Sequence, residues 1–215
     1  PHTIDFAVMV PHDPLRVFAM GDRAVFNQPA NDADIETMRG LVREALDEGA
    51  MGLSIGRSDF HKSSDGDWTP GSEAGHDELV GIAKAFDGVG HGVLQAVNDF
   101  DMLRPGETFE TEFDLMEAFF KAGKGRPGSM SLMERDFAPE DWKNIIRRTE
   151  AMNAEGLDIS LQVAPRAIGS FIGLNCTFHP LMAYPSYLAI ADKPLAKRVK
   201  ILSDSEYKAK LLAES

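Results

Sequence analysis

Two side chains in this sequence could serve in acid–base or metal chemistry, His12 and Asp99, and each follows a short apolar run. Neutral imidazole exchanges protons near neutral pH and binds metal ions, so His12 is a candidate general base or metal ligand. Alternatively, it is a structural histidine that bonds a neighbouring carbonyl in a tight turn. Asp99 could ligate a metal or orient a base, or it could cap the next turn. We take both as candidate catalytic residues.

Four further side chains could bind the carboxylate or amide of a substrate: Arg57, His61, Gln162 and Arg166. The planar fork of an arginine side chain suits carboxylates. Arg57 and His61 lie in a polar stretch over residues 56–71, and loops of that length inside compact domains are usually functional. The alternative is a solvated loop whose charges contact nothing specific. Gln162 lies near the end of a different apolar run and Arg166 comes after it, so the two flank Pro165, and Arg166 is a candidate carboxylate clamp.

The sequence contains no recognisable metal-binding motif. His-x-His, His-x-x-x-His and paired cysteines are all missing, so we assign no residue as a metal ligand. The single cysteine, Cys176, has no evident histidine partner and is not a candidate nucleophile.

The segments that must position these side chains alternate between two patterns. Short, β-prone apolar runs predict strands that are buried on both faces of a parallel sheet. Longer segments with apolar residues at helical spacing predict helices, with Asn31 as the cap of the first and Gly49 at its end. The predicted strands are residues 4–10, 51–55, 92–97, 129–133 and 158–163, and the predicted helices are 32–48, 77–87, 109–122 and 139–154.

This order of elements predicts an α/β fold with a parallel sheet and right-handed crossovers. A doubly wound open sheet and part of a (β/α)8 barrel are the two alternatives, and the sequence has no Gly-rich nucleotide-binding motif. Five strands are too few for a closed barrel, which needs eight, so we predict part of a barrel. We expect one segment over 1–215, with βα units in 1–164 and a loop and helical tail in 165–215. In either fold, chemistry belongs to the loops after the strands.

Charge and composition restrict the classes of partner. The chain of 215 residues has a net charge of −12, which disfavours binding to nucleic acid or to an anionic membrane. No apolar run reaches the ~18 residues of a membrane helix. One cysteine cannot form an internal disulfide, so we expect a reducing compartment, most simply the cytoplasm.

Three stretches are similar to one protein family. Residues 11–21 resemble its Gly-His-Gly-x-Leu-Arg…Met-Gly segment, and residues 41–54 match a helix that ends in Glu-Gly-Ala and continues into Gly-Leu-Ser. The tail over 184–214 is also similar. In these motifs the chain resembles part of the amidohydrolase relatives that include N-acyl-D-amino-acid deacylases.

The resemblance implies a barrel of the metal-dependent hydrolase type that splits the amide bond of an N-acyl amino acid. It also implies zinc as the cofactor, which would polarise the carbonyl and activate water. Two family histidines are replaced: Ala96-Val97-Asn98-Asp99 stands where Thr-His-x-Arg is expected, and Ser131-Leu132-Met133-Glu134 where Ser-His-Leu-Lys is expected. The zinc ligands are therefore not recognisable in this segment.

We thus expect an N-acyl-D-amino-acid deacylase-like hydrolase, incomplete as this fragment, whose partner is a small N-acyl amino acid. The alternative is a catalytically inactive barrel segment that acts as a ligand-binding or assembly module. Exposed strand edges invite pairing, so self-association or packing with the missing barrel strands is also expected.

Overall fold

The computed structural model describes residues 3–63, 65–100, 108–134, 138–167, 169, 171–176 and 179–214. The chain divides into two compact units. The first contains residues 1–61 and 68–166, and the second contains residues 62–67 and 167–215. No helix among the described residues is both long enough and apolar enough to cross a membrane.

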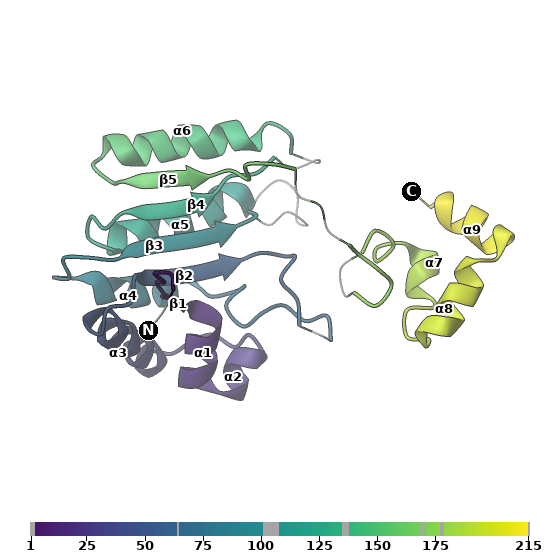
Figure 1. Cartoon of the computed structure of the whole chain (residues 1–215), viewed down its shortest axis with the longest axis horizontal. Helices are drawn as coiled ribbons and strands as arrows, with labels where there is room; N and C mark the ends of the chain where they lie inside the picture. Colours follow the sequence, from purple (N-terminus) through teal and green to yellow (C-terminus); the bar gives the residue numbers. More distant parts are fainter. Residues whose placement is uncertain are drawn as a thin grey trace. The chain divides into compact units, whose positions relative to one another are not determined.

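A five-stranded sheet forms the centre of the first unit, and its strands follow the order of the chain, β1-β2-β3-β4-β5 (Figure 1). Every neighbouring pair is parallel. The predicted α/β class with parallel βα units is therefore confirmed. The strands are β1 (Met9–Pro11), β2 (Gly52–Arg57), β3 (Val93–Asn98), β4 (Gly128–Ser131) and β5 (Ile159–Gln162).

Helices connect the strands, and three further helices belong to the second unit. The first unit contains α1 (His12–Met20), α2 (Asp22–Val25), α3 (Asp32–Asp47), α4 (His76–Ala83), α5 (Thr108–Ala122) and α6 (Asp141–Ala154). The second contains α7 (Pro185–Leu188), α8 (Leu195–Leu202) and α9 (Ser205–Leu212). The strand predicted over 4–10 is much shorter in the structure, because only its last residues pair with β2.

Helix α3 shows how local sequence fixes these elements. The Asn31 side chain accepts the backbone N–H of Asp34, and the Asp34 carboxylate accepts that of Asn31, which forms a capping box. Met38, Val42 and Leu46 recur at helical spacing and are fully buried. Beyond the helix, Gly49 adopts φ +101°, which favours glycine.

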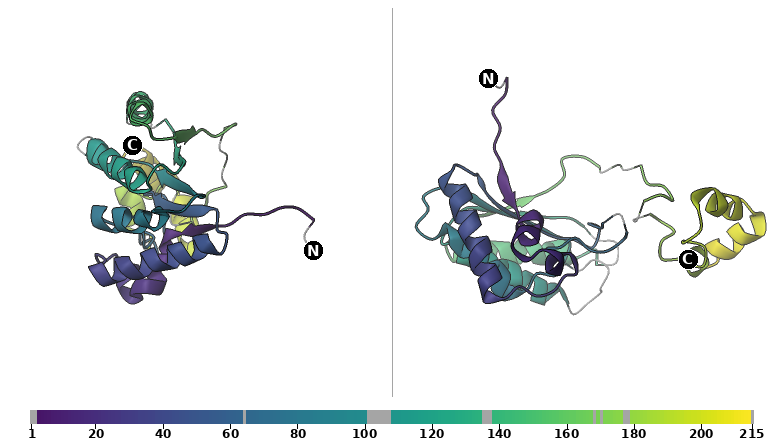
Figure 2. Two further views of the ribbon diagram at one scale, coloured as in Figure 1. Left: turned by 90° about the vertical axis from the view of Figure 1, so that its left-hand side faces the viewer. Right: turned by 90° about the horizontal axis from the view of Figure 1, so that it is seen from below.

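One face of the sheet packs against helices. Figure 2 (left) shows α3, α4, α5 and α6 on the same side of the strands. Alternate strand residues on that side are completely or almost completely buried, together with the phenylalanines of α5. These strand residues are Leu53, Ile55, Leu94, Ala96, Met130 and Ile159.

We call the opposite side of the sheet the open face, because no helix of the first unit's described residues covers it (Figure 2). One row across it is Ser54, Gln95, Ser129 and Ser160, which are partners in register. A second row continues the register with Gly56, Val97, Ser131 and Gln162. The prediction that the strands are apolar and buried on both faces was therefore wrong for this side, which is mostly polar and half-buried or exposed.

The second unit has a small core of its own. Tyr187, Ile190 and Leu211 are buried together. The Tyr207 hydroxyl donates to the carbonyl of Ser186 over 2.6 Å, and the Arg198 guanidinium donates to the Tyr187 hydroxyl over 2.7 Å. These bonds connect α7 with α8 and α9.

The start of β2 depends on a glycine. A Cβ on Gly52 would lie 1.9 Å from the carbonyl oxygen of Val93, which belongs to the neighbouring strand. We expect Gly52→Ala to lower the free energy of unfolding by about 4 kcal/mol or more, because backbone must move. Gly40→Ala is the control. Its Cβ meets nothing within 4 Å in the middle of α3, so it should stabilise by about 1 kcal/mol. Urea unfolding measures both, and similar midpoints for the two variants would contradict this packing.

Candidate functional site

The candidate residues follow strand ends that lie on one edge of the sheet. The strands are parallel neighbours, so their carboxyl ends share that edge. His12 directly follows β1, Arg57 is the last residue of β2, and Asp99 directly follows β3. Gln162 ends β5, and Arg166 comes four positions later. The backbone therefore brings them to one edge, but their side chains enter different surroundings.

His12 lies in a buried ionic network rather than in a cleft. Its Nε2 is 2.8 Å from Glu78 Oε1, and the same oxygen accepts a 2.8 Å bond from Arg16 Nε. The His12 and Glu78 side chains are only 1% and 3% exposed. His12 Nδ1 has no hydrogen-bond partner among the described residues. A dissolved substrate does not reach this imidazole in the arrangement described, and its catalytic role stays a prediction.

Arg16, which we did not predict as a site residue, is the centre of this network. Its guanidinium also donates to the carbonyl oxygens of Pro70 (2.6 Å) and Gln28 (2.5 Å). Arg16 thereby ties α1 to the loop before α4. The available sequence signal was its position four residues after His12, because that spacing places both side chains on one face of a helix.

Arg57 also pairs with a carboxylate of the protein itself. Its Nε and Nη2 donate to the two oxygens of Glu112 on α5 over 2.8 and 2.7 Å, and Nη1 donates to the carbonyl of Ala74 over 2.7 Å. Asn98 lies beside them, with its amide nitrogen 3.4 Å from Glu112. Arg57 and Asn98 alternate with the open-face residues, so they lie on the helix-covered side. The fork that we expected to bind a substrate carboxylate already holds one.

The Asp99 carboxylate binds backbone. Its Oδ2 accepts the N–H of Asp59 over 2.6 Å, and the N–H of Asp99 itself donates to the carbonyl of Arg57 over 3.2 Å. Asp99 is 3% exposed. This geometry resembles the capping alternative, although the loop that it fixes follows β2 and not β3. A catalytic role for Asp99 stays a prediction.

The remaining candidates lie nearer to solvent. The His61 side chain is exposed, and its Nδ1 would be 3.7 Å from a Cβ on Gly56, so the imidazole lies beside the open face at the end of β2. Gln162 belongs to the same register row and is exposed on β5. Arg166 is exposed as well. Substrate binding by His61, Gln162 and Arg166 stays a prediction.

The open face itself supplies polar groups that the sequence analysis did not single out. The Ser54 hydroxyl donates to Gln95 Oε1 across the β2–β3 pair. Ser129 and Ser160 continue this row on β4 and β5. The interiors of (β/α)8 barrels are usually filled by bulky branched residues. This surface instead offers hydroxyl and amide groups to a polar molecule.

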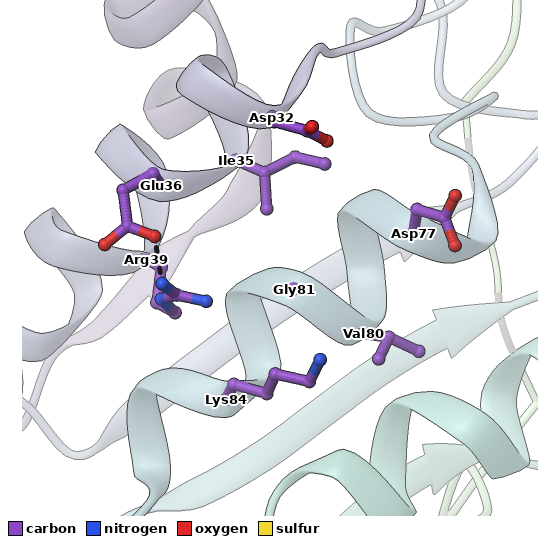
Figure 3. Close-up of a pocket in the computed structure, with 8 residues that line it drawn as sticks. All are labelled: Asp32, Ile35, Glu36, Arg39, Asp77, Val80, Gly81 and Lys84. Carbon is purple, nitrogen blue, oxygen red and sulfur yellow. Dashed lines mark hydrogen bonds and ion pairs between the residues drawn. The ribbon is translucent and has the colours of Figure 1, made fainter.

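A groove on the other side of the unit contains none of the candidates. It has a volume of about 350 Å³ and lies between α3 and α4 (Figure 3). Gly81 lets the two helices approach, because a Cβ there would come within 2.3 Å of Ile35 Cγ2. Arg39 on its rim is paired with Glu36. The groove reflects close helix packing, and we assign no chemistry to it.

The zinc ion that the resemblance implies does not fit the part of the chain that the structure describes. Within that part, no three histidine, cysteine, aspartate or glutamate side chains are grouped to hold a metal ion. The imidazole of His12 is held by Glu78, and the Asp99 carboxylate is held by backbone. We therefore derive no step through a metal.

Comparisons with protein-family models, with curated proteins and with solved structures find no match to this chain. The likeness to N-acyl-D-amino-acid deacylases thus stays a prediction from short motifs. Any proposal about the site therefore rests on the positions and contacts of its side chains.

Because of the His12–Glu78–Arg16 network, we expect the stability of the fold to depend on pH in the acid range. Burial raises the pKa of Glu78, but the hydrogen bonds and positive charges of His12 and Arg16 outweigh it, so the pKa lies below its usual value. Such a carboxyl stabilises the fold above its unfolded pKa, and this contribution is lost as pH falls through the folded pKa. We expect Glu78→Gln to cost about 3–5 kcal/mol near pH 7.

The difference between wild type and Glu78→Gln should shrink as the pH is lowered below the usual glutamate pKa. Urea unfolding near pH 7 and near pH 3 measures this change. Glu44→Gln, at an exposed position on α3, is the matched control and should change little at either pH. A difference that stays constant across this range would contradict the ionised network.

The Arg57–Glu112 pair predicts a non-additive mutant cycle. Arg57→Met or Glu112→Leu alone should cost about 3–5 kcal/mol, because each leaves a buried charge without its partner. The double variant should recover most of that loss, since both charges are then gone. Chemical denaturation of the four proteins gives the coupling energy. Additive losses would show that the pair is not the structural unit described above.

Proposed function

We propose that the first unit is a segment of a (β/α)8 barrel of the metal-dependent hydrolase type that binds an N-acyl amino acid. The strand order, with all of α3 to α6 on one face, carries this proposal. In a doubly wound sheet the strand order reverses at a switch point, and helices cover both faces. Right-handed crossovers that always step in one direction leave the helices on one side, as in a barrel.

In this proposal the open face is part of the barrel interior. An N-acyl amino acid presents an amide and a carboxylate, and both need hydrogen-bond partners when they leave water. The row of Ser54, Gln95, Ser129 and Ser160 offers hydroxyl donors and amide groups at adjacent strands. A few such groups are typical of ligand sites, where they fix orientation.

His61, Gln162 and Arg166 would complete the site at the carboxyl ends of the strands. A protonated His61 or the Arg166 guanidinium would attract the substrate carboxylate. In the hydrolysis that the resemblance implies, water adds to the amide carbonyl and the C–N bond breaks, which gives a carboxylate and an amino acid. We assign substrate binding, and no step of that reaction, to these side chains. One cysteine leads us to propose the cytoplasm as its compartment.

A second candidate function is assembly through a strand edge. Strand β1 pairs only with β2, so its other edge has no partner among the described strands. The preceding segment exposes Ile4, Phe6 and Val8 at alternate positions, and Val8 accepts the N–H of Met51 over 2.8 Å. Such an edge is a template for a further parallel strand, from the same protein or from a second copy.

Ligand titration tests the main proposal. Isothermal calorimetry with N-acetyl-D-leucine and its L enantiomer measures binding, and assay of free leucine measures turnover. We expect Gln95→Leu, which keeps the volume but removes the amide, to weaken binding about tenfold or more. Thr37→Ala on the exposed surface of α3 is the control and should bind as wild type does. Equal affinity of wild type and Gln95→Leu, or no binding of either enantiomer, would refute the proposal.

A further inference from the structure

A small pocket lies where β4 and β5 end. Its volume is about 210 Å³. Leu132, Met133 and Glu134 directly follow β4, Val163 directly follows β5, and Trp142 comes from the first turn of α6. The pocket is therefore at the same edge of the sheet as the candidate residues, but none of them lines it.

Its walls are largely apolar. Leu132, Met133, Trp142 and Val163 supply hydrocarbon and aromatic surface, and Val163 is 65% exposed. A ligand that covers such surface gains roughly 25 cal/mol for each Å² removed from water. Pockets for drug-sized ligands usually measure about 300–1,000 Å³. This one is smaller, so it suits a single short alkyl chain.

Among the described residues that line the pocket, Glu134 is the only one with an ionisable side chain. Within the described part of the chain, its carboxylate has no hydrogen bond and no ion pair, and its side chain is exposed at the mouth of the pocket. Lys143 Nζ lies 5.4 Å from the centroid of the Trp142 ring, and Lys143 is paired with Glu140. At the mouth of the pocket, Glu134 therefore supplies a negative charge that no described side chain neutralises.

We propose that this pocket binds a short alkyl chain that carries an ammonium group. The chain lies against Trp142 and Val163, and the ammonium donates to the Glu134 carboxylate. Bonds between an ammonium and a carboxylate are stronger than bonds between neutral groups. The same charge repels an alkyl carboxylate, and a neutral alcohol has neither the attraction nor the repulsion.

This inference goes beyond the substrate site proposed above and does not need it. One link between the two does rest on the proposed function. Hydrolysis of an N-acyl amino acid liberates an amino acid, and one with an apolar side chain offers this pocket an ammonium group when its own carboxylate points to solvent. The acylated substrate, whose nitrogen is a neutral amide, does not.

Tryptophan fluorescence tests the pocket directly, because the chain has only two tryptophans. In a Trp68→Phe background, Trp142 is the sole reporter, and a thermal melt checks that this background folds as wild type does. The probes are pentylammonium, pentanol and pentanoate. Because Glu134 is exposed and solvent screens the pair, we expect pentylammonium to bind about two- to fivefold more tightly than pentanol, and pentanoate to bind most weakly.

Three variants in this background decide whether Glu134 and the apolar wall act as proposed. Glu134→Gln should abolish the preference for pentylammonium over pentanol and leave pentanol binding unchanged. Val163→Ser should weaken binding of all three probes. Glu150→Gln, at an exposed position further along α6, is the control and should change none of them.

Equal responses to pentylammonium and pentanoate, or an ammonium preference that survives Glu134→Gln, would overturn the proposal. The lack of any fluorescence response to the three probes would do so as well. Failure of the substrate site looks different, since N-acetyl-D-leucine would then not bind while pentylammonium still did.

Discussion

The first unit depends on one constraint, which is that successive parallel strands are added on the same side of the growing sheet. A right-handed crossover then always returns over the same face, so the helices gather there and the other face receives none. The buried residues of the strands, such as Leu53 and Met130, point toward the helices. The polar ones, such as Gln95, alternate with them. The division of the sheet into an apolar face and a polar face is thus a consequence of strand order together with the twofold alternation of side chains.

A second feature of the first unit is that glutamate side chains in helices pair with the buried His12, Arg16 and Arg57. Glu78 near the start of α4 binds His12 and Arg16, and Glu112 in α5 binds Arg57. An arginine that is almost fully buried needs a carboxylate, because an unpaired charge in the interior costs several kcal/mol. Both acids lie in helices that follow the loops after strands. They therefore hold those loops against the sheet, and they pair with cations that looked available in the sequence.

The structural features that depend on residues close together in the chain could be predicted from the sequence. The cap at Asn31, the end of α3 near Gly49 and the alternation of strands and helices all depend on neighbouring residues, and all are present. The sequence did not predict the partner of Arg57, because Glu112 is 55 residues away and no local pattern connects them. The sequence also did not predict the polar row on the open face. Ser54, Ser129 and Ser160 are single polar residues in short runs, and only the strand register places them side by side.

Two of the positions at which the chain departs from the deacylase pattern line the pocket at the ends of β4 and β5. The pattern expects histidine at positions 97 and 132 and lysine at 134, where this chain has Val97, Leu132 and Glu134. Val97 lies in the second row of the open face, and the other two line the pocket. Compared with that pattern, these positions carry apolar side chains instead of imidazoles and a carboxylate instead of an ammonium group. Apolar surface and a negative charge therefore lie together at this edge of the sheet. This combination matches the alkylammonium ligand that we propose for the pocket.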